Sequence, residues 1–203
     1  MSREALRTVT LALQNIIHSG LGGGGVPDDT VFVGPPLPTL VGARPVSVLA
    51  FHIEPNKELR NADRLVDTGG SDPRVQQALP LDVRYLISVF RQASASDPNE
   101  LLRMGEVIAA LHSNAIIGGS LVPGQKVRLS PEPYPMEELS RIWGLFPSSP
   151  YATSMVYLAS PVYIDAATFV QGAPVDSRRL DSGVSAVPPD VLGTGGNGLG
   201  AGG

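Results

Sequence analysis

The sequence predicts an α/β (α+β) fold, with a small mixed or mostly antiparallel sheet of four to five strands flanked by about three helices. The first observation is that segments of helical and of strand periodicity alternate along the chain in the order helix, strands, helix, strand, helix, strand, which argues against an all-β sandwich. The second is that 203 residues with 42% hydrophobic content suffice for one domain with a core plus extra segments.

The central element is a strand at residues 80–90. Apolar side chains recur there at every second position, the period of a strand with one buried face: Leu81, Val83, Tyr85, Ile87 and Val89. The opposite face is polar at Asp82 and Arg84 and apolar at its end, so we predict a strand in the middle of the sheet, covered fully on one side and partly on the other. We interpret Asp82 and Arg84 as a solvated or cross-strand pair in preference to a catalytic pair.

A helix precedes this strand at the beginning of the chain. Ser2 can cap it, Gly20 can end it, and one apolar stripe follows a helical spacing: Leu6, Val9, Leu13, Ile16 and Ile17. The glycine-rich stretch 20–29 then follows a helix, not a strand, and lacks the Gly-Lys-Ser/Thr ending of a phosphate-binding loop. We therefore expect it to be a flexible loop.

Two strands are expected between the first helix and the central strand. Residues 31–33 form a short candidate, and residues 46–54 form a longer one with Leu49, Phe51 and Ile53 on one face and Val48, Ala50 and His52 on the other. His52 therefore reads as a half-buried histidine of the sheet. The polar stretch 55–79 is expected to be a long loop that faces solvent or a partner.

The second half of the chain is expected to contain two helices and two strands. Asp97 and Pro98 start a helix whose predicted buried stripe is Leu101, Met104, Ile108 and Leu111. A short strand at 125–130 follows, and Pro135 then opens a helix that Trp143 packs onto the sheet. The last strand, 153–165, contains Pro161, so we expect it to be an edge or to be bulged there.

Composition excludes several functional classes. The net charge of −4 and the absence of a basic stripe argue against nucleic acid and anionic membranes as partners. The chain has no cysteine, and His18, His52 and His112 lie on separate elements without a second ligand at metal spacing. We expect no catalytic residues, no cofactor and no metal site, and we expect the protein to be made in the cytoplasm because no secretory signal is visible.

The domain organisation follows from the distribution of glycine. Residues 1–170 are expected to form a single α/β domain and residues 171–203 a Gly/Pro-rich flexible tail. From Asp176 onward the chain has eight Gly, two Pro and no aromatic residue, so it cannot bury enough surface to offset the entropy of ordering. We therefore predict that the tail is disordered on its own.

Four ordered stretches together resemble one protein family. They are FHIEPNKELRN at 51–61, PLDVRYL at 80–86, ALH at 110–112, and LSRIW at 139–143 followed by Pro150-Tyr151 and the alternating last strand. This set is similar to the cap, or tail-terminator, proteins of extracellular contractile injection systems, which are phage-tail-like particles. The resemblance spans residues 3 to about 165, excludes the Gly-rich tail, and departs at Ala152, where many members have Arg.

The resemblance implies a non-enzymatic assembly protein whose copies form a ring, a hexamer, that closes the distal end of the inner tube and sheath. The implied partners are copies of the chain itself and the tube and sheath subunits, within a particle that the cell can release. The alternatives are another structural tail part, such as an adaptor or baseplate piece, or a hydrolytic enzyme that the particle carries. The candidate partner contacts are Asn56, Arg60 and Asn61, for which a loop N-cap and local salt links are the competing interpretation.

Overall fold

The computed structural model describes residues 4–59, 64–66, 74–76, 78–91 and 98–165, all within the compact unit Met1–Val170. In chain order the elements are α1 (Ala5–Gly20), the 3-10 helix η2 (Pro27–Asp29), β1 (Val31–Val33), α2 (Pro38–Val41), β2 (Val46–Pro55), β3 (Arg64–Val66), β4 (Arg74–Gln76), β5 (Ala78–Val89), α3 (Asn99–Ser113), β6 (Ile116–Ile117), β7 (Val127–Glu132), α4 (Met136–Gly144) and β8 (Thr153–Asp165). The predicted tail lies outside the described residues, so its flexibility and the domain boundary stay predictions.

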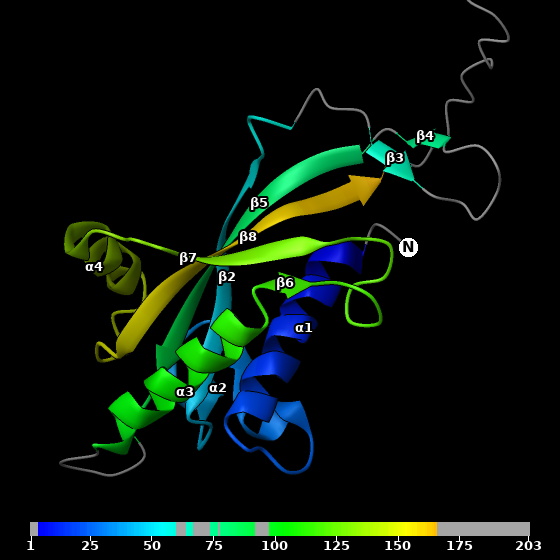
Figure 1. The fold of residues 1–203 in the computed structure, drawn as a ribbon. Coiled ribbons are helices and arrows are strands. Elements are labelled where there is room, and N and C mark those ends of the chain that lie inside the picture. Colours follow the sequence, from blue (N-terminus) through cyan, green and yellow to red (C-terminus); the bar gives the residue numbers. More distant parts are fainter. Residues whose placement is uncertain (1–3, 60–63, 67–73, 77, 92–97, 166–203) are drawn as a thin grey trace, which may run out of the picture. The chain divides into compact units, whose positions relative to one another are not determined.

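The sheet is mixed, as predicted, but it is larger than predicted. Six strands follow the order β1-β2-β5-β8-β7-β6; β1 runs parallel to β2 and every other neighbouring pair is antiparallel (Figure 1). The prediction of four to five strands was wrong because β6 has only two residues, too few to show a period. The stretch 55–79, expected to be a loop, also contains the separate antiparallel pair β3 and β4.

Strand β5 lies between β2 and β8 and has the two faces that its alternation predicts. The first face is buried at every predicted position, Leu81, Val83, Tyr85, Ile87 and Val89, in the main core beneath α1 and α3. These two helices pack side by side on that face (Figure 1). Since each buried side chain of this size contributes roughly 1.5–3 kcal/mol, this face supplies most of the stability of the fold.

The second face of the sheet is covered over only part of its area. Helix α4 packs there through Leu139 and Trp143 against Leu86 and Val156, so the predicted packing of Trp143 onto the sheet is confirmed. The rest of this face, around Asp82 and Arg84, has no helix over it in the part of the chain that the structure describes. This uncovered half is where polar side chains gather.

Helix α3 is present, but its buried stripe differs from the predicted one at two positions. Leu101 is 69% exposed and Ile108 only partly buried, whereas Glu100, Met104, Val107 and Leu111 are buried. The pattern misled because Glu100, a charged residue, enters the buried stripe through bonds to Arg91 and Thr153. The expected helix-starting residues Ser2 and Asp97 lie outside the described residues.

Strand β2 departs from simple alternation at a β-bulge. Ala50 pairs with Tyr85 and His52 with Arg84, so Phe51 is an extra residue without an opposite partner. The alternation of side chains between the two faces of the sheet shifts by one residue at Phe51, and His52 therefore lies on the second face. The prediction that His52 shares a face with Val48 and is half-buried was therefore wrong; it lies exposed beside Arg84.

Strand β8 has the irregularity predicted at Pro161. Its pairing with β5 shifts between Leu81, which faces Val162, and Val83, which faces Ala159, so Ser160 and Pro161 form a bulge. The pairing of β8 with β7 also ends at Ser160. Both expectations for Pro161, a bulge and an edge, are confirmed.

No helix in the described ranges is long and apolar enough to cross a membrane.

Candidate functional site

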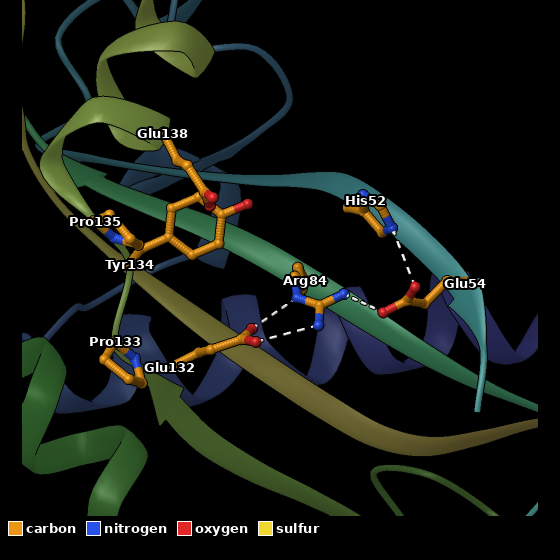
Figure 2. A pocket seen from close by; sticks show the side chains of 8 residues that line it. All are labelled: His52, Glu54, Arg84, Glu132, Pro133, Tyr134, Pro135 and Glu138. Atoms are coloured by element: carbon orange, nitrogen blue, oxygen red, sulfur yellow. Dashed lines mark hydrogen bonds and ion pairs between the residues drawn. The ribbon is translucent and has the colours of Figure 1, made fainter. Parts of the chain in front are cut away.

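The uncovered half of the second sheet face carries a group of charged side chains around Arg84. Arg84 lies on β5, His52 and Glu54 come from β2, and Glu132 is the last residue of β7. The pocket at this place is completed by residues that connect β7 to α4 or lie at the start of α4: Pro133, Tyr134, Pro135 and Glu138 (Figure 2). We call these eight residues the charged pocket.

Arg84 connects strands that are not neighbours in the sheet. Its Nε donates to Glu132 Oε2 at 2.8 Å and its Nη2 to Glu132 Oε1 at 3.1 Å, a bidentate pair that passes over β8 (Figure 2). Its Nη1 donates to Glu54 Oε1 at 2.5 Å on the other side. The Arg84 side chain is only 19% exposed, so the two carboxylates also balance the cost of placing its charge against the sheet.

The pKa shifts follow from this geometry. Hydrogen bonds to Glu132 and then to Glu54 raise the pKa of Arg84, and the hydrogen bond from Arg84 lowers the pKa of Glu54. Both groups therefore stay ionised at neutral pH. Such a pair fits binding and stabilisation better than acid–base chemistry, which needs a pKa near the working pH.

An aromatic ring forms one wall of the charged pocket. Tyr134 packs edge-to-face against Phe51 at 5.9 Å between ring centroids, and burial raises the pKa of its hydroxyl. His52 Nε2 lies 3.7 Å from Glu54 Oε2. Glu138 projects from the first turns of α4 toward Tyr134 (Figure 2).

A second polar cluster surrounds the predicted contact residue Asn56. Its Nδ2 donates to Asp82 Oδ1 at 2.9 Å and to Ser160 Oγ at 3.2 Å, and its Oδ1 accepts from the backbone N–H groups of Glu58 and Leu59. This is the loop cap named as the competing interpretation. A partner contact by Asn56 stays a prediction, and Arg60 and Asn61 lie outside the described residues.

The sequence identified only part of this site. Asp82 and Arg84 were expected to be a solvated or a cross-strand pair, and the structure shows bonds across strands. Arg84 pairs with Glu54 of β2 and Glu132 of β7. Asp82 accepts from Ser160 of β8 and from Asn56, which follows β2. Neither Glu54 nor Glu132 was predicted to belong to the site. The predicted strand 125–130 stopped two residues before Glu132. The apolar alternation beside Glu54 gave no sign that a bulge turns it toward Arg84.

The geometry offers no centre of metal chemistry within the described ranges, where no group of three or more His, Cys, Asp or Glu side chains is placed to hold an ion. The fold and the site define a mixed α/β protein whose second sheet face is charged where α4 does not cover it, an arrangement suited to binding. Residues 8–178 match the model of the Pvc16 N-terminal domain, and the chain belongs to this family.

Two solved structures share the fold. One is the PVC sheath/tube terminator in the extended state, from an extracellular contractile injection system, with 16% identity, a TM-score of 0.54, and coverage of 88% of this chain and 64% of that chain. The other is the tube-terminating cap of the anti-feeding prophage, with 20% identity, a TM-score of 0.56, and coverage of 84% and 59%.

The chain thus spans about three fifths of the length of both structures. No curated protein matches it. The resemblance to the cap and terminator family that the four sequence stretches indicated is confirmed.

Proposed function

We propose that this protein is a structural cap, which closes the distal end of the inner tube and sheath of a contractile injection system. The observation that carries the proposal is the family match over residues 8–178, together with the fold shared with one sheath/tube terminator and one tube-terminating cap. In this role the chain is not an enzyme. It is made in the cytoplasm and incorporated into a particle that leaves the cell.

The proposed assembly is a ring of identical copies, six in number, in contact with tube and sheath subunits. A ring closes through head-to-tail interfaces, in which one surface of a copy meets a different surface of the next. The free edge of β1 does not favour strand addition, because Gln14 Nε2 donates to the carbonyl of Val31 at 2.8 Å. Pro131 likewise interrupts the donors of β7. These features favour association through faces and loops.

The test combines native mass spectrometry with binding to pre-assembled tubes. We expect one discrete closed oligomer, with six copies, and co-sedimentation of the protein with tubes and with extended sheath–tube particles. Gold labelling of a tagged copy in electron micrographs should mark the end of the particle opposite the baseplate. A protein that stays monomeric at high concentration and binds neither tube nor sheath would contradict the proposal, and labelling at the baseplate would favour an adaptor.

A further inference from the structure

The charged pocket on the uncovered sheet face has the composition of a recognition site for a cationic side chain. We propose that it binds an arginine side chain presented by a partner subunit. The inference rests on the proposed function, which supplies neighbouring subunits, and it adds the place and the chemistry of one contact.

The first argument is charge complementarity. The pocket contains three carboxylates, Glu54, Glu132 and Glu138, and only one guanidinium, that of Arg84. Apart from His52, the lining therefore carries an excess of two negative charges. The exposed Lys57, which acts on Glu54 from outside the lining, reduces this excess without removing it. A second cation that enters the pocket would therefore be attracted and would complete the neutralisation.

The second argument is that two polar groups of the pocket keep free bonding capacity. Within the described part of the chain, neither the Glu138 carboxylate nor the Tyr134 hydroxyl has a hydrogen bond or ion pair, whereas Glu54 and Glu132 are already bound to Arg84. Glu138 lies close enough to raise the pKa of Tyr134. These two groups, side by side at the rim, can accept the N–H donors of an incoming guanidinium.

The third argument is the shape of the aromatic wall, which favours arginine over lysine. Tyr134 stands between Pro133 and Pro135 and is braced edge-to-face by Phe51, so its ring has little freedom to move. A planar guanidinium can stack on a fixed ring and at the same time bond a carboxylate through two donors, whereas an ammonium acts as a point charge. No helix of the described residues closes the pocket over the sheet face, so a side chain presented by another subunit can enter it.

The test uses saturation-transfer difference NMR, which tolerates a large oligomer, with N-acetyl-arginine amide as the probe and the uncharged isostere N-acetyl-citrulline amide for comparison. We expect arginine signals with the wild-type chain and about tenfold weaker binding of citrulline. Glu138→Gln should weaken arginine binding by a similar factor. Glu137→Gln is the matched control, because Glu137 lies on the same helix, points elsewhere and pairs with Arg141.

Equal binding of the two probes, or equal effects of Glu138→Gln and Glu137→Gln, would overturn the inference. Tyr134→Leu adds a second readout, since it removes the stacking surface and leaves all charges in place; unchanged arginine binding would also contradict the proposal. The two proposals fail separately. A chain that forms rings on tubes but does not bind arginine refutes only the pocket, and a chain that binds arginine but never assembles refutes only the cap.

Discussion

Arg84 organises the second face of the sheet with a single side chain. Three of its nitrogens bond carboxylates from β2 and β7, which are separated in the sheet by β5 and β8. The planar fork of a guanidinium makes this possible, because its donors point in fixed directions that suit two partners on opposite sides. Arg84 thus joins three strands, β2, β5 and β7, across β8, on the part of this face that α4 does not cover.

Replacement of Arg84 by Leu should lower the free energy of unfolding by about 1–2 kcal/mol at pH 7, because Glu54 and Glu132 then lose their hydrogen bonds to the guanidinium. The hydrogen bond from Arg84 lowers the pKa of Glu54 in the folded state, so this stabilisation is present above the unfolded pKa and is lost as the pH falls through the folded value. Urea unfolding at pH 7 and at about pH 3 measures both effects.

The control for this variant is Arg141→Leu, which removes an exposed pair within α4, that of Arg141 with Glu137. It should cost less than about 0.5 kcal/mol. Equal losses for the two variants at pH 7, or a loss for Arg84→Leu that is the same at both pH values, would show that the paired carboxylates do not contribute as described.

The burial of Tyr85 leads us to predict that the fold loses stability at alkaline pH. Its ring is fully buried and burial raises its pKa to about 12, while its hydroxyl bonds Thr10 Oγ1 at 2.9 Å. Since the folded pKa lies above the unfolded value of about 10, the stabilisation is complete below about pH 10 and is lost as the pH rises through about 12. The wild type should lose roughly 2–3 kcal/mol over this window. Tyr85→Phe should lose much less in urea titrations at the same pH values, and parallel losses would contradict this account.

At the scale of elements, hydrophobic periodicity predicted the buried faces where the backbone is regular. It failed where one residue interrupts the pattern. The alternation in β5 placed its side chains on the correct faces because this strand is long enough to show the period. In β2 the extra residue Phe51 reversed the phase, and in α3 Glu100 replaced an apolar residue in the buried stripe. Neither a bulge nor a buried charged residue can be recognised from the hydrophobic pattern of the sequence. Both depend on contacts with residues that are distant in the chain.

Helices α1 and α3 approach each other closely at a glycine, Gly20. A Cβ atom added to Gly20 would lie 2.3 Å from the Cβ of Ala110, which is far below a van der Waals contact. The sequence correctly predicted Gly20 as the end of the first helix. Gly20 also allows the two helices to pack against one sheet face. This second role depends on Ala110, 90 positions later in the chain, and could not be predicted from the residues around Gly20.

Gly20→Ala should therefore destabilise the fold by about 1–3 kcal/mol through overpacking. Gly105→Ala is the matched change on α3, where an added Cβ meets nothing within 4 Å, and it should stabilise by roughly 0.5–1 kcal/mol through helix propensity. Thermal and urea unfolding of the two variants measures the difference. Partial recovery in the double variant with Ala110→Gly would confirm the contact, and a neutral Gly20→Ala would refute it.

At the scale of the whole molecule, the fold class and the family could be predicted from the sequence, but the site only in part. The order of helical and strand periods limits the architecture to a sheet with helices, and the four ordered stretches indicated the family. The charged pocket, in contrast, joins Glu54, Arg84 and Glu132, whose meeting depends on a strand order in which sequence neighbours are not all spatial neighbours. Strand order of this kind arises from packing of the complete core.

The position of the core within the chain predicts which part carries stability. Among the described residues, the buried members of both apolar clusters lie between Ala5 and Val162. We therefore predict that a chain that ends at residue 170 unfolds with the free energy of the full chain to within about 0.5 kcal/mol. A chain that ends at residue 158 should fail to fold, because it loses Ala159 and Val162 from the main core. Urea unfolding of the three chains, with the slope compared as well as the midpoint, makes the measurement. A clearly lower midpoint for the chain ending at 170 would show that residues 171–203 support the fold, and would move the predicted domain boundary.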